Sequence, residues 1–254
     1  MTRHYAKLFI VLFLGMLLIP LRTLAFDPYA IEDSFYTRAR LVTWTSNLRL
    51  TLGDRVFPKV VVGDDGWLVY TAEGDLDVYE KSASFTEEQL AQFQVNLDAL
   101  SSAYAERGIM LVVVIVPSKN TIYPERVPSQ IARIGTESKL DQVAAYLSAH
   151  GETQILDLRP ALLQAKTERE IYLATDTHWN DYGAYLAYSL LIERLGESYP
   201  NLSPRPLSDF AEQLLEPESL DLANVIGATS LTESKLRLAP NFDLATSYKT
   251  INLG

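Results

Sequence analysis

The sequence predicts an α/β fold with a doubly wound, mostly parallel sheet. Helix-type segments alternate with short apolar runs along most of the chain, which is the pattern of βαβ units. The run IMLVVVIVP (109–117) is apolar without alternation, as expected for a strand covered on both faces. Further strands are predicted at 154–159 and 171–175. A length of 254 residues, with 48% hydrophobic and 21% charged residues, fits one such domain.

The helices of this fold are predicted from caps and apolar spacing. Thr86 and Gln89 stand at the two positions of a capping box, and Gly108 ends the helix predicted at 84–108. Further segments with helical patterns are 34–50, 137–151, 160–167 and 180–196. Residues 60–71 hold two β-branched runs around a Gly-Asp-Asp-Gly turn, which predicts a hairpin.

The first 25 residues have the pattern of a targeting segment. Arg3 and Lys7 precede the apolar run LFIVLFLGMLLIPL (8–21), whose 14 residues are fewer than the roughly 20 needed to span a membrane. We interpret residues 1–25 as a secretory signal peptide, with an uncleaved signal anchor as the alternative. Both place the protein outside the cytoplasm. Residues 26–59 then form a lead-in segment, and residues 60–254 form the domain.

Charge and cysteine content exclude two classes of function. The net charge is −10, whereas binding to nucleic acid needs a basic face, so nucleic acid is not an expected partner. The chain has no cysteine, which excludes a disulfide framework and a thiolate metal site.

Asp176 and His178 are the candidate catalytic residues, and they directly follow the strand predicted at 171–175. Ligands of open α/β sheets collect beyond the carboxyl ends of strands. Side chains two positions apart in extended backbone point to the same side. The carboxylate can therefore accept the Nδ1 proton of the imidazole, leaving Nε2 free to act as a general base.

Two other interpretations of this pair stay open. Asp176 can simply cap the following helix while His178 lies at the surface. The two side chains are also fair metal ligands, but the sequence shows no two further ligands beside them, so no metal is expected.

The motif TDTHWNDYGAYLAY (175–188) resembles the signature of the AlgX/AlgJ family, whose SGNH-hydrolase-like domains are linked to O-acetylation of alginate and related polysaccharides. Other segments resemble that family in the same order. They are GDDGWLVY (63–70), VVVIVPSKNTIYPERVP (112–128), ILDLRPALL (155–163) and DLANVIG (221–227), with Leu220 where the family has glycine. The resemblance covers about residues 60–238 and implies a three-layer α/β/α fold.

The resemblance also implies a mechanism, in which Asp176 orients His178 and His178 serves a catalytic serine. In the family that serine follows the motif, at the tip of another strand. Ser247 is a weak candidate and Ser230 a weaker one, because neither follows a strand with the expected pattern. We therefore expect the nucleophile beyond Gly254, so that the chain is a fragment or an inactive form lacking its last strand.

Four more residues are candidates for substrate binding, each with a structural alternative. Lys119 lines the predicted cleft or is an ordinary loop lysine, and Tyr123 contacts substrate or packs the loop. Trp179 stacks on a sugar or lies in the core, and Asn180 donates to an oxyanion or caps a helix.

The reaction expected from the resemblance is transfer of an acetyl group to an exported polysaccharide outside the cytoplasm, in the periplasm or cell envelope, without a cofactor. A membrane protein that delivers the acyl group is the expected partner. The alternatives are a carbohydrate esterase and a non-catalytic glycan-binding or scaffold protein.

Overall fold

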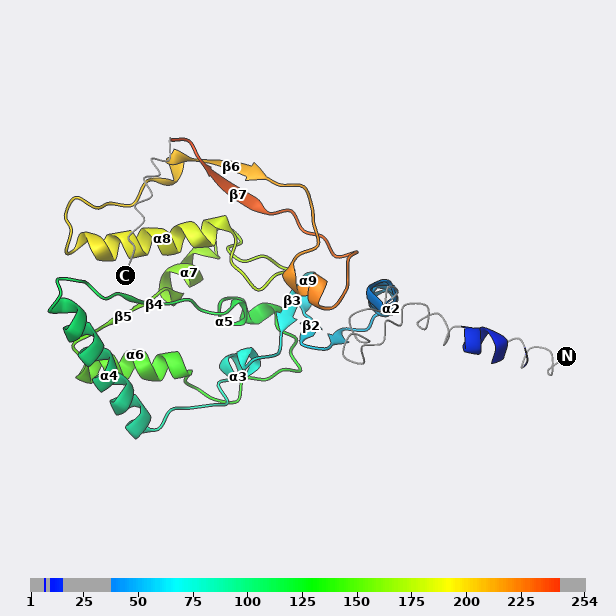
Figure 1. Cartoon of the computed structure of the whole chain (residues 1–254), viewed down its shortest axis with the longest axis horizontal. Coiled ribbons are helices and arrows are strands. Elements are labelled where there is room, and N and C mark those ends of the chain that lie inside the picture. Colours follow the sequence, from blue (N-terminus) through cyan, green and yellow to red (C-terminus); the bar gives the residue numbers. More distant parts are fainter. Residues whose placement is uncertain (1–6, 8–9, 16–37, 243–254) are drawn as a thin grey trace, which may run out of the picture.

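The computed structural model describes residue 7, residues 10–15 and residues 38–242. Figure 1 shows β4 and β5 near the middle of the molecule, with α4 and α6 on one side and α7 and α8 on the other. Helices thus lie on both sides of this pair of strands. Among the described residues, no helix has both the length and the apolar content needed to cross a bilayer.

The predicted helices are present, and their caps explain where they begin. α4 (Glu87–Ala105) begins after Thr86, whose hydroxyl accepts from the backbone N–H of Gln89 while the Gln89 side chain binds the Thr86 N–H. Ser138 and Asp141 form the same reciprocal pair at the start of α6 (Lys139–His150). The remaining helices predicted from sequence are α2 (Arg38–Thr51), α7 (Arg159–Ala165) and α8 (Asp181–Gly196).

The doubly wound, mostly parallel sheet is not confirmed. The described residues contain one parallel pair, β4 (Val113–Ile115) with β5 (Ile155–Asp157). Both strands are half-buried rather than fully covered, and no further strand pairs with them in the part of the chain that the structure describes. The apolar run at 109–117 is thus longer than the strand it contains.

The prediction of a strand at 171–175 was wrong. Only Tyr172 makes a β-bridge, to Trp179, and the rest of the segment is loop and turn. Its residues are apolar because the loop is buried: Ile171 has no exposed surface and Leu173 is 7% exposed. A buried loop and a buried strand have the same composition, so the apolar run alone does not separate them.

The predicted hairpin is present within a three-stranded antiparallel sheet. β2 (Val60–Val62) pairs with β3 (Leu68–Tyr70), with Val61 opposite Val69, across the 3-10 turn η2 (Asp64–Gly66). β1 (Val56–Phe57), which belongs to the lead-in segment, is the third strand and pairs with β2.

The C-terminal part holds an antiparallel pair, β6 (Phe210–Leu214) with β7 (Leu236–Pro240). This pair lies over α8 in Figure 1. The backbone N–H of Leu238 on β7 donates to the Asp181 carboxylate at the start of α8, over 2.9 Å. Short helical elements complete the fold: α3 (Asp75–Glu80), α5 (Lys119–Ile122), η3 (Pro124–Arg126), η4 (Leu207–Asp209) and α9 (Asp221–Val225).

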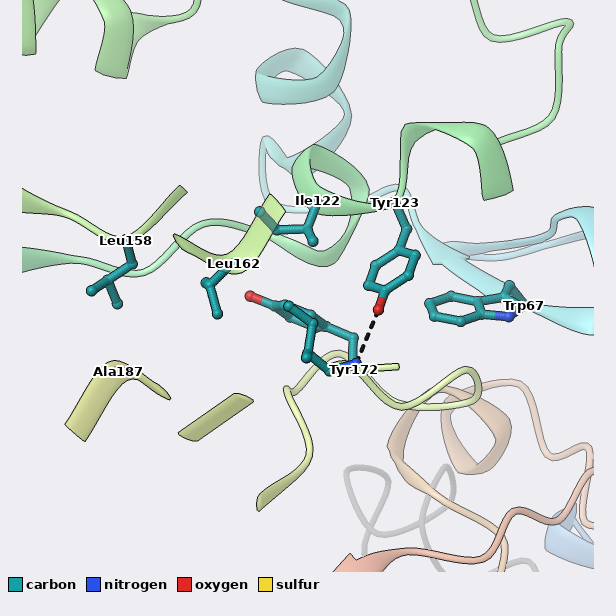
Figure 2. Close-up of a cluster of buried hydrophobic side chains, with 8 residues drawn as sticks. Trp67, Ile122, Tyr123, Leu158, Leu162, Tyr172 and Ala187 are labelled. Carbon is teal, nitrogen blue, oxygen red and sulfur yellow. Dashed lines mark hydrogen bonds between the residues drawn. The ribbon is translucent and has the colours of Figure 1, made fainter. Parts of the chain in front are cut away.

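The main hydrophobic core joins side chains of α5, α7 and α8 to Ile171 and Tyr172, at the start of the 171–178 loop (Figure 2). The rings of Trp67 and Tyr123 have centroids 4.5 Å apart. The dashed line in Figure 2 is the bond from the buried Ile171 N–H to the Tyr123 hydroxyl, 2.9 Å long. The core therefore holds the start of the loop on which the candidate catalytic residues lie.

Candidate active site

Asp176 and His178 are in hydrogen-bond contact. Asp176 Oδ1 lies 2.7 Å from His178 Nδ1 and 3.0 Å from the His178 backbone nitrogen. The Asp176 side chain is 13% exposed, whereas the His178 side chain is 74% exposed. A largely buried carboxylate thus contacts Nδ1 of an imidazole ring that is mostly exposed to solvent.

The charge of Asp176 decides which imidazole nitrogen carries the proton. Burial by itself would raise the pKa of this carboxyl group, but hydrogen bonds from the His178 ring, the His178 N–H and the Asp221 N–H hold it below its ordinary value. Asp176 is therefore an anion at neutral pH and only accepts hydrogen bonds. We assign the proton to Nδ1 of His178, and Nε2 is left as the free base.

Thr177 links this pair to α9. Its hydroxyl lies 3.2 Å from His178 Nδ1 and donates to the Asp221 carboxylate over 2.9 Å. Asp221 is the first residue of α9, and its own N–H reaches Asp176 Oδ2. The helix start and the loop thus bind one another through side chains and backbone.

Lys119 lies buried beneath the loop, with 5% of its surface exposed. Its Nζ donates to the carbonyl oxygens of Leu173, Ala174 and Asp176. Burial lowers the pKa of Lys119 to about 7, although nearby acidic groups oppose this change. The sequence expectation placed Lys119 at this edge of the fold, and the structure places it there as an anchor of the loop.

Glu233 binds the N–H groups of the same loop. Its carboxylate accepts from the backbone nitrogens of Ala174 and Thr175 over 2.9 Å and 2.8 Å, and from the Thr175 hydroxyl. Glu233 was not predicted from the sequence, where it stands in the polar segment SLTESK without any distinguishing pattern. A cation and an anion therefore hold the two sets of backbone groups in one short loop.

A cavity of about 400 Å³ opens beside this loop. The residues that line it include Tyr70, Asp75, Lys119, Asn120 and Thr177. Its size is in the range of small-molecule sites, roughly 300–1,000 Å³. The Asn120 amide spans its floor, donating to the Tyr70 carbonyl and the Asp75 carboxylate. Asp75 is partly buried, and burial raises the pKa of its carboxyl group.

The other candidate binding residues are placed as structural elements. Tyr123 is 5% exposed and lies in the core, so its ring offers no surface for the expected substrate contact. Trp179 is half-buried against the same core. Asn180 caps α8, accepting from the Gly183 N–H over 3.0 Å and donating to the Glu170 carbonyl over 2.8 Å. Both ends of that amide are occupied.

Among the described residues, no serine lies in hydrogen-bond contact with His178 as a nucleophile would. Ser230 lies at the surface, and its hydroxyl donates to the Asn47 side chain on α2 over 2.6 Å. The Ser230 hydroxyl is therefore bonded to α2 and not to His178. Ser247 lies outside the described residues. In the described part of the chain, the His178 ring hydrogen-bonds only to Asp176 and Thr177.

Ligand atoms of Asp176, His178 and Asp221 lie within 4.8 Å of one another, close enough to share a metal ion. The contacts between these groups are nevertheless hydrogen bonds of ordinary length. Asp176 uses its carboxylate on His178, and Asp221 uses its carboxylate on Thr177. Both carboxylates thus have a hydrogen-bond partner within the protein.

Residues 60–251 match the family described as the SGNH hydrolase-like domain of the acetyltransferase AlgX. The chain belongs to this family. The match includes the hairpin, both central strands, the Asp176–His178 pair and the β6–β7 pair, and it confirms the resemblance drawn from the sequence. The fold is therefore SGNH hydrolase-like, although its described sheets are small and mixed.

Individual members of the family are similar over much of the chain. A "Probable alginate O-acetylase AlgJ" from Pseudomonas syringae pv. tomato is 30% identical over 237 residues, covering 85% of this chain and 58% of the relative. The protein of the same name from Pseudomonas aeruginosa is 31% identical over 172 residues, covering 68% of this chain and 41% of the relative. The chain thus spans about half the length of the curated relatives it matches.

Two solved structures are similar to the chain. The O-acetyltransferase domain of Pseudomonas putida AlgJ superposes with a TM-score of 0.45 at 23% identity, over 71% of this chain and 64% of that one. Bacillus cereus PatB1, solved with a sulfonyl adduct, gives a TM-score of 0.49 at 17% identity, over 71% of this chain and 55% of the other.

Proposed function

We propose that this AlgX-family domain transfers an acyl group, most simply acetyl, to a hydroxyl of an exported polysaccharide. The observation that carries this proposal is the 2.7 Å contact between Asp176 and His178, whose imidazole is exposed. A cavity of about 400 Å³ is lined by Thr177, the residue between them. The family description as an acetyltransferase and the names of the AlgJ relatives supply the reaction class and the kind of acceptor.

The reaction follows from the free Nε2 of His178. Nε2 takes the proton of a serine hydroxyl as the serine oxygen attacks the carbonyl carbon of the acyl donor, and the departing donor group receives that proton from the imidazolium. A sugar hydroxyl then loses its proton to Nε2 and attacks the acyl carbon. The serine oxygen leaves and recovers the proton, so the acetyl ester ends on the sugar. Asp176 stabilises the imidazolium in both halves.

The nucleophile in this scheme is a serine that follows the described residues. Ser247 is the candidate within the sequence. A radioactive or mass-labelled acetyl group trapped on the protein, followed by peptide mapping, identifies the position. Ser247→Ala should leave the label in place if the nucleophile lies elsewhere, and should abolish labelling if it is Ser247.

The surroundings of the site follow from the same proposal. The domain works outside the cytoplasm, and its partners are the polysaccharide and a membrane protein that delivers the acyl group. Lys119 and Asn180 act by holding the loop and the start of α8 in place, because their polar atoms are already bonded to the protein. Trp179 is the remaining candidate for direct contact with a sugar.

Two alternatives use the same fold. A carbohydrate esterase would pass the acyl group to water instead of sugar. A glycan-binding or scaffold protein without chemistry is favoured by one observation: in the part of the chain that the structure describes, no serine hydroxyl bonds to His178.

The deciding experiment supplies p-nitrophenyl acetate as donor and mannuronate oligosaccharides as acceptor, and follows acetylated sugar by mass spectrometry and free acetate by NMR. Transfer predicts acetylated sugar, the esterase predicts free acetate without acetylated sugar, and the binding protein predicts neither. His178→Ala should abolish product formation, whereas His150→Ala, a change at the end of α6, should leave it intact. Turnover at the wild-type rate in His178→Ala would refute the mechanism.

A further inference from the structure

A second cavity, of about 390 Å³, lies between α8 and the β6–β7 pair. Half of the residues that line it are aromatic, namely Tyr185, Tyr188, Phe210 and Phe242. The rings are in contact with one another. Tyr185 and Phe210 have centroids 5.6 Å apart, and Phe210 and Phe242 have centroids 5.7 Å apart, both edge to face.

The tyrosine rings of this cavity are held in fixed positions by the backbone of one residue. The Tyr185 hydroxyl donates to the Arg205 carbonyl over 2.9 Å, and the Arg205 N–H donates to the Tyr188 hydroxyl over 3.1 Å. Because the rings are already immobilised, a ligand that stacks on them loses little affinity to the ordering of side chains.

Polar groups stand at the edge of the aromatic walls. The Arg205 guanidinium lies 4.0 Å from the centre of the Phe242 ring and is half exposed. Asp181 is exposed and also lines the cavity. Flat apolar walls bordered by hydrogen-bonding groups fit a pyranose ring, which has apolar C–H faces and a rim of hydroxyl groups.

The cavity is joined to the candidate active site through α8. Asp181, on the cavity wall, is the first residue of α8 and follows the Asp176–His178 loop and the Asn180 cap directly. Tyr188 lies seven residues further, so a rise of 1.5 Å per residue places its Cα about 10 Å along the helix. The bond from Leu238 to Asp181 holds the β7 wall to the same helix turn.

We propose that this cavity is a binding subsite for a sugar residue of the acceptor glycan, remote from the residue that is acylated. The sugar stacks on Tyr185 and Tyr188, and its hydroxyls bind Arg205 and Asp181. The inference rests on the proposed function for the identity of the ligand. It extends that function by giving the enzyme a preference for chains over single sugars.

The test measures glycan binding directly, without acyl donor, by isothermal titration of the full chain with mannuronate hexasaccharide and with cellohexaose. We expect one of these probes to bind, and Tyr188→Ala to weaken that binding by about tenfold. Tyr188→Phe, which keeps the ring, should bind within about twofold of the wild type, as should Tyr199→Ala, which removes an exposed ring outside the cavity. Near-ultraviolet circular dichroism checks that each variant is folded.

Binding and catalysis are separated by a second variant. His178→Ala should retain oligosaccharide binding while losing transfer, so failure of the chemistry does not count against the subsite. The inference is overturned if neither probe binds the wild type, or if binding is the same in Tyr188→Ala.

Discussion

Lys119 and Glu233 bind opposite sets of backbone groups in the same short loop. The Lys119 ammonium group donates hydrogen bonds to the carbonyl oxygens of Leu173, Ala174 and Asp176. The Glu233 carboxylate accepts hydrogen bonds from the N–H groups of Ala174 and Thr175 and from the Thr175 hydroxyl. The backbone polarity of a buried loop, which a sheet would otherwise satisfy, is thus satisfied by two side chains of opposite charge.

Lys119→Met should unfold more easily than the wild type. The change keeps the apolar stem but leaves the Leu173 and Asp176 carbonyl groups without their donor, while the Ala174 carbonyl keeps its bond from the Leu68 N–H. It also leaves the Glu233 carboxylate without its nearby cation. We expect a loss on the order of 3–5 kcal/mol in the free energy of unfolding, as for other buried charges deprived of a partner. Urea unfolding followed by tryptophan fluorescence measures it, and acetyl transfer should fall with it at temperatures where the variant is still folded.

Lys235→Met is the matched control. Lys235 lies near the same site and pairs with Glu218 at the surface, where ion pairs contribute about 0–1 kcal/mol. A loss in Lys119→Met no larger than that in Lys235→Met would mean that the loop is held without the buried ammonium group.

The stability of the wild type should rise with pH relative to Lys119→Met. Burial lowers the pKa of Lys119 to about 7 in the folded chain, from 10.5 for a free lysine, so between these values the unfolded chain binds more protons. The cost of burying the charge is fully present below about pH 7 and is relieved as the pH rises toward 10. The difference in urea midpoint between the two proteins, measured across this window, should therefore grow. A constant difference would contradict the placement of an ionisable amine in the core.

The helices were predictable because their signals are local. Two residues three positions apart form the capping box at each helix start: Thr86 with Gln89 for α4, and Ser138 with Asp141 for α6. The Asp176–His178 contact was predictable for the same reason.

The 171–175 loop was not predictable, because what distinguishes it from a strand lies far away in sequence. Its carbonyl groups bind Lys119 and its N–H groups bind Glu233, two residues from separate segments that meet only after folding. Asp221 joined the site in the same way. The resemblance marked the segments that contain Lys119 and Asp221, but neither pattern nor resemblance indicated Glu233.

Asp176→Asn should reduce acetyl transfer by a factor on the order of 10⁴ while leaving the fold intact. The amide is nearly the same size but carries no charge, so it neither fixes the Nδ1 proton nor stabilises the imidazolium. The Asn variant should also be less stable, because it lacks the ionised Asp176 carboxylate, whose pKa is lowered in the folded wild type. The contribution of this carboxylate to stability is present above the ordinary aspartate value of 3.8 and disappears as the pH falls below it. Rates close to wild type would show that the carboxylate has no part in catalysis.

Tyr123→Phe tests the bond between the core and the loop. Removing the hydroxyl leaves the buried Ile171 N–H, now 2.9 Å from its acceptor, without a partner, at a cost of about 1–3 kcal/mol. Thermal and urea unfolding should both report the loss. Tyr199→Phe, at a half-exposed position, should change stability by less than about 0.5 kcal/mol. Equal effects in the two variants would indicate that water or another acceptor replaces the Tyr123 hydroxyl.

Gly183→Ala sets two effects of opposite sign against each other. In an α-helix the change from glycine to alanine normally stabilises by about 1 kcal/mol, because alanine has less backbone entropy to lose. At position 183, however, an added Cβ would lie 2.5 Å from the Ile171 carbonyl oxygen and 2.9 Å from the Trp179 Cβ. Neither neighbour is a flexible side-chain end, and overpacking of this kind costs about 1–3 kcal/mol. We therefore expect a net loss of stability, together with a displaced His178 and slower acetyl transfer. Urea unfolding gives the sign directly: a variant more stable than the wild type would mean that α8 moves away from the loop without resistance, and the close packing of α8 against residues 171–179 would then play no part in holding the site.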